Sequence, residues 1–257
     1  MTAALHAEWT KLRTLTATAW LYLGAVAVTV GVSAAVAAAT HQSAGGGGQD
    51  PTKLALTGID VGQAVVAVLA VLAISEEYET GMIRTTLAAM PSRLIVLGAK
   101  AANVAALTFV AGLVAVTGSL IAGRLMLPAS GLDPAHGYAL VSVTHAATFR
   151  AAVGSVIYLT LIGLLALGVA TAIRDTAVSI GAVLAILYLP PLLAQLVGNP
   201  LRRHLEQIAP MTAGLAVQAT RNLHDLPIAP WAGLGVLAGW TAASFLVASA
   251  LLRRRDA

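Results

Sequence analysis

The sequence predicts an all-α, polytopic integral membrane protein that crosses the bilayer six times. Of its 257 residues, 58% are hydrophobic and only 10% are charged, whereas a soluble domain carries about 25% charged residues. A helix needs about 20 apolar residues to cross the hydrocarbon core of a bilayer. We expect the six spans to form a single transmembrane domain over residues 1–257. The stretches that meet this length are Ala19–Ala39, Leu54–Ile74, Leu94–Ala122, Ala151–Ile173, Thr176–Val197 and Pro230–Leu252.

The lysines and arginines between the spans predict the orientation of the chain. Six spans place both termini on one side, and that side carries nine Lys and Arg residues if Lys100 reaches the surface from the start of the third span. The other side carries six, in longer loops. Because cytoplasmic loops are enriched in positive charge, we expect both termini in the cytoplasm. The net charge of +4 then reflects topology and lipid contact, and we expect no nucleic-acid partner.

The stretch Thr2–Leu15 precedes the first span and predicts a helix that lies along the membrane surface. Its apolar residues recur at helical spacing. This pattern places Trp9 at the depth of the lipid headgroups and Lys11 and Arg13 against anionic lipid. Such a helix anchors the chain where it meets the membrane. The alternative is a helix that also contacts a partner protein.

The most informative cytoplasmic segment is Ser75–Arg93. Glu76, Glu77 and Glu79 stand at its start, where the positive end of a helix dipole favours acidic residues. An apolar stripe at helical spacing follows, and Pro91 ends the pattern. A segment with both signs of charge beside an apolar stripe favours a helix that docks on another protein. A connector lying on the membrane surface is the alternative.

Sequence motifs for catalysis are missing from this chain. There is no Gly-x-x-x-x-Gly-Lys-Ser/Thr loop for nucleotide phosphates, no His-Glu-x-x-His zinc motif and no Gly-x-Ser-x-Gly nucleophile turn. Cysteine is absent, and the six histidines are scattered among separate segments. We therefore expect no enzyme activity, no metal and no cofactor in this chain.

Polar residues within or near the spans form a candidate intramembrane site, Asp60, Gln63 and Asn103. An ionisable residue in a span is costly and often functional. For Asp60 three interpretations are open: contact with water at the outer interface, pairing with Arg150 or Arg124, and coupling to an ion. Two further patterns concern helix shape and packing. Pro190-Pro191 predicts that the fifth span ends or bends there, and Gly58-x-x-x-Gly62 and Gly235-x-x-x-Gly239 predict close helix contacts, within the chain or at a dimer seam.

Three motifs, in this order along the chain, resemble the permease subunits of ABC-2-type transporters. They are Glu-Trp-Thr-Lys-Leu-Arg at positions 8–13, Glu-Tyr-Glu-Thr-Gly-Met-Ile-Arg-Thr-Thr-Leu at positions 77–87, and Leu-Leu-Ala-Leu-Gly-Val-Ala-Thr-Ala-Ile-Arg-Asp at positions 164–175. The resemblance covers almost the whole chain. It implies an ATP-driven exporter of a bacterial cytoplasmic membrane, in which two separate ATPase subunits bind the ATP and Mg²⁺ and a second permease copy or a homologous permease completes the substrate path.

The resemblance also assigns roles to individual residues. The segment between spans two and three would be a coupling helix seated in a groove of the ATPase, with short outer helices preceding the last span. Two other readings of the chain stay open: an ion-coupled secondary transporter that uses Asp60, and a membrane anchor or sensor component. The residues assigned to ATPase coupling are Glu76 or Glu77, Thr80, Gly81, Arg84, Thr85 and Pro91, with Arg174 and Asp175 in the second cytoplasmic turn.

Overall fold

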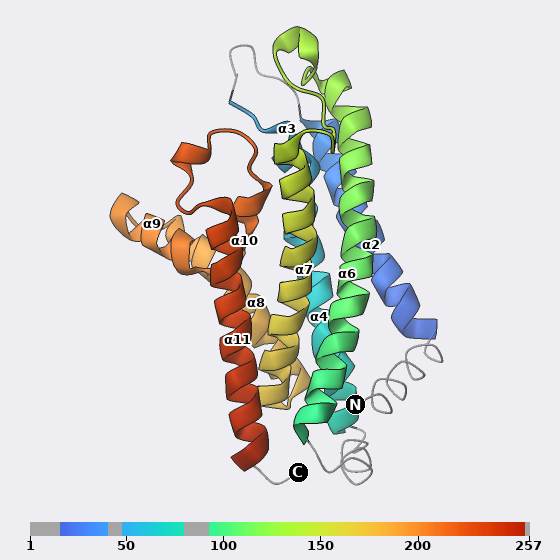
Figure 1. Cartoon of the computed structure of the whole chain (residues 1–257), viewed down its shortest axis with the longest axis vertical. Helices are drawn as coiled ribbons and strands as arrows, with labels where there is room; N and C mark the ends of the chain where they lie inside the picture. Colours follow the sequence, from blue (N-terminus) through green and yellow to red (C-terminus); the bar gives the residue numbers. More distant parts are fainter. Residues whose placement is uncertain (1–15, 41–47, 80–92, 255–257) are drawn as a thin grey trace.

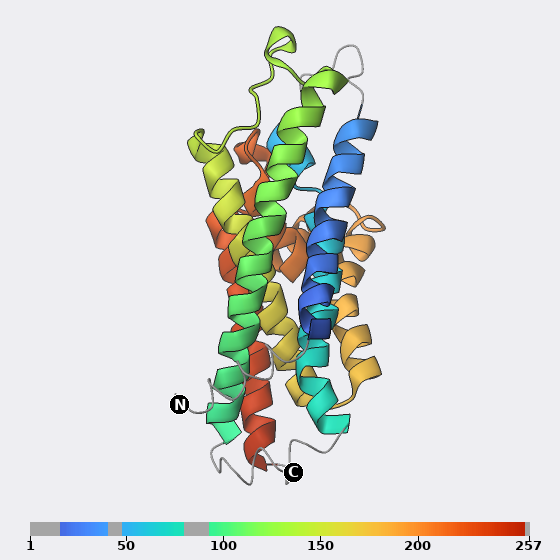
Figure 2. The same cartoon turned by 90° about the vertical axis from the view of Figure 1, so that its right-hand side faces the viewer.

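The protein is a bundle of helices (Figures 1 and 2). The computed structural model describes residues 16–40, 48–79 and 93–254, and every regular element in these ranges is a helix. The long helices run along a common axis, with most of the short elements near the upper end in Figure 1. The long helices are α2 (Thr16–Ala39), α4 (Ile59–Glu79), α6 (Arg93–Met126), α7 (Ala146–Ile173), α8 (Thr176–Ala194) and α11 (Pro230–Arg254). The short elements are α3 (Pro51–Ala55), α9 (Asn199–Ile208), α10 (Pro210–Leu215) and the 3₁₀ helices η1 (Leu127–Ser130), η2 (Pro134–His136), η3 (Ala216–Gln218) and η4 (Leu223–Asp225).

Within the described residues, five helices are long and apolar enough to cross a membrane: α2, α6, α7, α8 and α11. They indicate a multi-pass membrane protein. The remaining long helix, α4, has a shorter apolar part, Ile59–Ser75. The sixth crossing therefore stays a prediction, although α4 as a whole has 21 residues. The predicted span 54–74 is interrupted, because α3 ends at Ala55 and the backbone N–H of Gly58 donates to Ser33 Oγ (3.0 Å) on α2 before α4 begins.

Other spans also differ from the predicted bounds, and α7 begins at Ala146, five residues before the predicted start at Ala151. α6 has 34 residues, which gives a length of about 50 Å at 1.5 Å per residue. It therefore exceeds the thickness of a hydrocarbon core and continues beyond the predicted end at Ala122. Pro190 and Pro191 both lie inside α8, and the helix ends at Ala194, three residues before the predicted end at Val197. Each proline lacks the N–H that would bond one turn back, which is consistent with an end soon after the pair.

Helix α7 lies at the centre of the bundle and packs against α4, α6, α8 and α11. Tyr158, Ile162 and Ala166, one helical turn apart, are fully buried on it. In the most apolar stretch of each span, 61% of α7 is buried within the protein, but only 22% of α8 and of α11. A movement of α7 would therefore be transmitted directly to four neighbouring helices.

Much of the outer face of the bundle is apolar. Trp20, Leu125, Leu196 and Leu246 are each more than two-thirds exposed, on or beside four different long helices. Large apolar side chains exposed on so many helices are unfavourable in water, whereas lipid tails solvate them without penalty. The exposed surface, like the helix lengths, thus indicates a membrane protein.

The Gly58–Gly62 motif serves packing within the chain. A Cβ added at Gly62 would overlap the hydroxyl of Thr29 on α2, and one at Gly58 would overlap the backbone oxygen of Thr29. The two glycines therefore let α4 approach α2 closely, as small residues do in bilayers. A Cβ at Gly235 or Gly239 on α11 would meet open space.

Candidate functional site

The α7–α8 turn lies at the lower end of the bundle, where α4 ends and α6 begins (Figure 1). Arg174 ends α7 with a left-handed backbone (φ 67°), and such a conformation is uncommon outside glycine. Asp175 then caps α8, because its Oδ1 accepts from the backbone N–H of Val178 (2.8 Å). Two residues thus reverse the chain, and they present an exposed carboxylate and a half-buried guanidinium at this end.

The other residues assigned to coupling are only partly placed. Glu76 and Glu77 belong to the last turns of α4, which end at the lower end of the bundle. Thr80, Gly81, Arg84, Thr85 and Pro91 lie outside the described residues, and so does the predicted coupling helix. Trp9, Lys11 and Arg13 of the predicted interfacial helix also lie outside them. What the structure brings together is the turn Arg174–Asp175 and the two helix ends that flank residues 80–92.

Lys100 does not reach the surface, so it cannot be counted among the cations exposed on the side of the termini. It is only 4% exposed, and its Nζ donates to the backbone oxygen of Ala73 on α4 (3.3 Å). An ammonium can be buried only where polar partners replace its water. Lys100 therefore joins α6 to the lower part of α4, close to the helix ends described above.

A buried polar cluster joins α4, α7 and α8 nearer the other end of α4. The Tyr158 hydroxyl donates to Gln63 Oε1, and Gln63 Nε2 donates to the backbone oxygen of Asp60 (3.1 Å). The Tyr188 hydroxyl of α8 donates to the same Asp60 oxygen. Gln63 and Tyr158 have no exposed surface, so each polar group in the cluster depends on the others for its hydrogen bonds.

The side chain of Asp60 is half-buried in the first turn of α4. Its carboxylate makes no hydrogen bond or ion pair with another described residue. The pairing with Arg150 or Arg124 is not seen: Arg150 Nη2 donates instead to the backbone oxygen of Ala219, and Arg124 is exposed on α6. Access to water and coupling to an ion remain the two interpretations of Asp60.

Asn103 lies apart from this cluster. It is ten residues above the lower start of α6, whereas Gln63 is sixteen residues above the lower end of α4. At 1.5 Å per residue, Asn103 is about 15 Å along α6 from its lower end, and Gln63 is about 24 Å along α4 from its lower end. Asn103 Nδ2 is buried and has no hydrogen-bond partner among the described residues. The structure thus joins Asp60 to Gln63 but does not join Asn103 to either.

Tyr158 and Tyr188 are the functional candidates that sequence reasoning missed. Both stand in otherwise apolar stretches, at positions where a phenol hydroxyl has no lipid partner and must bond to protein. This requirement could have identified Tyr158 and Tyr188 as members of a polar cluster from the sequence.

A second polar junction connects distant segments at the upper end. Asp50 caps α3 by accepting from the N–H groups of Thr52 (3.1 Å) and Lys53 (3.3 Å), and it also accepts from the N–H groups of Thr220 and Arg221. The Arg221 guanidinium lies 5.2 Å from the centre of the Tyr138 ring, within the range of a cation–π contact. One carboxylate therefore holds the segment before α4 against the segment before α11.

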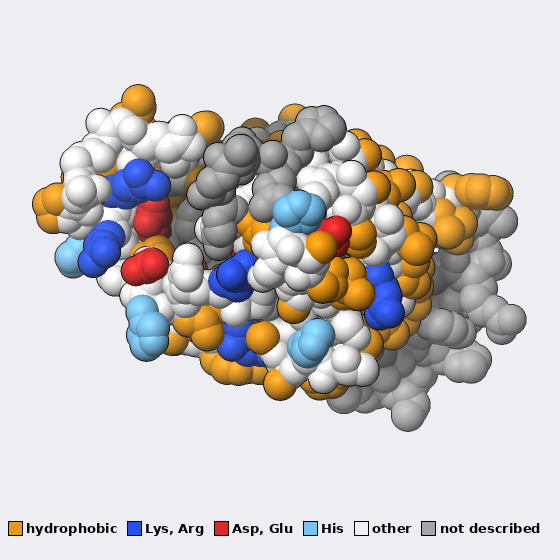
Figure 3. Space-filling view, turned by 90° about the horizontal axis from the view of Figure 1, so that it is seen from above, with side chains coloured by type: hydrophobic (Ala, Val, Ile, Leu, Met, Phe, Trp, Pro, Cys, Tyr) orange, Lys and Arg blue, Asp and Glu red, His pale blue; other side chains and the backbone are white. Residues whose placement is uncertain are grey.

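Charged side chains gather on this upper end, and Figure 3 shows them from above. Asp133 accepts from the backbone N–H of His136 and contacts His136 Nδ1 (2.6 Å). These bonds hold the pKa of the Asp133 carboxyl below its usual value. In the described ranges no group of three or more His, Cys, Asp or Glu side chains could hold a metal ion.

Comparison with known proteins gives no assignment. Neither a scan against protein-family models nor a search of the curated proteins finds a match to this chain.

Proposed function

We propose that this chain is the membrane permease subunit of an ATP-driven exporter of the ABC-2 type. Two copies, or one copy and a homologous permease, would enclose the substrate path, and two separate ATPase subunits would supply the ATP and Mg²⁺ chemistry. The observation that carries the proposal is the meeting of the turn Arg174–Asp175 with the ends of α4 and α6 at one end of the bundle. These are the elements that the ABC-2 resemblance assigns to ATPase contact.

The packing gives such a docking site a mechanical route into the membrane. The turn Arg174–Asp175 connects α7 directly to α8, and α7 packs on four helices. The bond between Tyr158 and Gln63 ties α7 to α4 as well. A push on the lower end by a closing ATPase dimer would therefore move α4, α7 and α8 together, because close-packed interiors transmit displacement instead of absorbing it.

The proposed location is a bacterial cytoplasmic membrane with the lower end of the bundle in the cytoplasm. The positive-inside bias of the loops supports this orientation, and Arg253 and Arg254 in the last turn of α11 lie at the same end. ATP is available on that side. The apolar character of the spans favours an amphipathic cargo over a highly charged one.

Replacing Glu77 and Arg84 tests the docking site. The double variant Glu77→Ala/Arg84→Ala should insert into the membrane normally and lose co-purification with the ATPase subunit. The matched control is Arg202→Ala/Glu206→Ala, which removes an exposed ion pair of the same charge types (2.8 Å) on α9. The control should keep the complex. An intact complex in the Glu77/Arg84 variant would show that docking does not use this segment.

A second candidate, ion-coupled secondary transport, rests on Asp60. Its half-buried carboxylate makes no hydrogen bond or ion pair with a described residue, although Lys53 interacts with it electrostatically, and such a group can carry a proton or a sodium ion across a membrane. This candidate predicts transport that continues when ATP is removed and stops in Asp60→Asn. The exporter proposal predicts that transport stops when ATP is removed and continues in Asp60→Asn. A membrane anchor or sensor would show no transport under either condition.

A further inference from the structure

One cavity lies on the outside of the bundle, between α6, α7 and residues 141–144. It has a volume of about 670 Å³. Its floor is made of buried side chains, among them Val116, Leu120 and Val156, and its rim of exposed ones, among them Phe109 and Phe149. We call this cavity the α6–α7 groove. Because the rim side chains are exposed, the groove opens to the lipid and not to the interior of the bundle.

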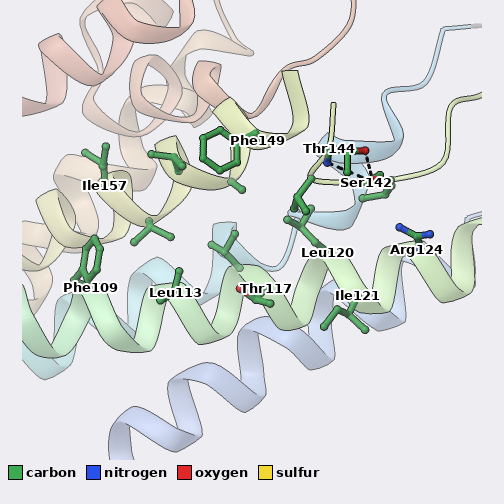
Figure 4. A pocket seen from close by; sticks show the side chains of 16 residues that line it. Phe109, Leu113, Thr117, Leu120, Ile121, Arg124, Ser142, Thr144, Phe149 and Ile157 are labelled. Carbon is green, nitrogen blue, oxygen red and sulfur yellow. Dashed lines mark hydrogen bonds between the residues drawn. The ribbon is translucent and has the colours of Figure 1, made fainter. Parts of the chain in front are cut away.

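One end of the groove is polar, and away from that end the lining is apolar except for Thr117. Arg124, Ser142 and Thr144 line the polar end, and Figure 4 shows Arg124 near the two hydroxyl residues, with Phe109 and Ile157 at the opposite end. The hydroxyls of Ser142 and Thr144 lie 2.9 Å apart. Arg124 makes no hydrogen bond or ion pair with another described residue. A guanidinium and two hydroxyls beside one another are a donor set suited to a phosphate.

The length of the groove matches one leaflet of a bilayer. Phe109 and Arg124 are fifteen residues apart on α6, which corresponds to about 22 Å. Half of the hydrocarbon core is about 15 Å deep, and the headgroup layer adds about 5–7 Å. The apolar part of the groove therefore lies at the depth of acyl chains, and Arg124 lies at the depth of phosphates.

We propose that the α6–α7 groove binds an anionic phospholipid, with its acyl chain along Leu113 and Val153 and its phosphate against Arg124. Charge complementarity selects this occupant over a zwitterionic lipid, because Arg124 lies at headgroup depth and pairs with no acidic side chain of the described residues. A protein helix would fill the apolar part equally well, but nothing in its chemistry would require an anion at that one height. The proposal is independent of the ATPase partner.

Native mass spectrometry of the full chain tests this site. The protein is reconstituted in vesicles of equal parts phosphatidylcholine and phosphatidylglycerol and is then released with its bound lipid. The unchanged chain should retain phosphatidylglycerol in preference. Arg124→Gln should lower the retained ratio of phosphatidylglycerol to phosphatidylcholine by about fivefold, since one cation near anionic lipid contributes about that factor. Arg203→Gln, an exposed cation on α9 outside the groove, should leave the ratio unchanged.

A second variant tests the apolar part of the groove. Val153→Trp fills the space beside Phe149 and should reduce retention of both lipids. Leu246→Trp, an equally bulky change at an exposed position on α11, should not. Two results would overturn the proposal. One is the same lipid ratio in Arg124→Gln and Arg203→Gln. The other is unchanged lipid retention in Val153→Trp, for which the oligomeric state is measured as well and would be reduced. The second result would identify the groove as a protein interface.

Discussion

Gly62 shows how the absence of one side chain sets the distance between two helices. A Cβ at this position would overlap the Thr29 hydroxyl, which is itself held by a hydrogen bond to the backbone oxygen of Ala25 (2.7 Å). The hydroxyl cannot move aside without losing that bond. The contact between α2 and α4 is therefore limited at this point by backbone and side chain together.

Gly62→Ala should destabilise the protein by about 1–3 kcal/mol, the usual cost of forcing added atoms into a packed interface. The midpoint of thermal unfolding in detergent measures the effect. Gly235→Ala is the matched control, because its Cβ would meet open space on α11; it should leave the midpoint unchanged or raise it, since alanine favours a helix. Equal midpoints for the two variants would contradict the packing described between α2 and α4.

Gln63 and Tyr158 depend on each other in the same way. Each is fully buried, and each supplies a hydrogen-bond partner for the other. Removing one partner leaves a buried polar group unsatisfied, whereas removing both leaves an apolar contact. The pair is therefore suited to a double-mutant cycle.

Tyr158→Phe and Gln63→Leu should each lower stability, and the double variant should lose less than the sum of the two. Coupling energies between polar side chains within membranes are about 0.6 kcal/mol on average and reach about 1.7 kcal/mol. Unfolding in mixed micelles provides the three free-energy differences. Additive losses would show that the two side chains do not interact in the folded protein.

At the scale of elements, the sequence predicts the long helices well and the break between α3 and α4 poorly. Apolar runs of about 20 residues predict membrane-spanning helices whatever the other helices of the protein are. The break does not change the local pattern, because Leu54, Leu56 and Ile59 continue the apolar run across it. It depends instead on contacts from far along the chain, notably the bond from Gly58 to Ser33 on α2.

Asp50 is the second long-range determinant of this region. Asp50-Pro51 is a recognisable helix start, with a carboxylate cap and proline in the first turn. Its hydrogen bonds to the N–H groups of Thr220 and Arg221 cross 170 residues of sequence. No local pattern could have indicated them.

Asp50→Ala should loosen the segment around Thr220 as well as α3. Loss of a helix cap costs about 0.5–2 kcal/mol, and the N–H groups of Thr220 and Arg221 lose their acceptor as well. Hydrogen exchange at these two amides should accelerate. Asp133→Ala is the control, because Asp133 also caps a short proline-started helix but bonds only to its own turn. Unchanged hydrogen exchange at Thr220 in Asp50→Ala would contradict the contact between Asp50 and the segment around Thr220.

At the scale of the whole molecule, the candidate site divides into a part that sequence could indicate and a part that it could not. The grouping of Asp60 with Gln63 follows from their spacing on one helix. The partners Tyr158 and Tyr188 come from two other helices, and the separation of Asn103 depends on the opposite directions of α4 and α6. Relations between helices of this kind are set by packing, which a pattern along one chain does not contain.

The proposed function also belongs to the scale of the whole molecule. The bundle places one turn and two helix ends together at its lower end, and we propose that an ATPase binds there. In the proposed exporter, the chain is one of two permease subunits, and ATP is hydrolysed by a different polypeptide. The composition of the isolated complex is then the direct test.

Native mass spectrometry of the tagged full chain, extracted from its own membrane in mild detergent, measures that composition. We expect an assembly with two permease chains, at least one of them this 26.0 kDa subunit, and two copies of an ATPase that carries a Gly-x-x-x-x-Gly-Lys-Ser/Thr loop. Addition of ATP and Mg²⁺ to this assembly should give hydrolysis. A stable, intact chain that is isolated repeatedly without any such ATPase would contradict the central claim.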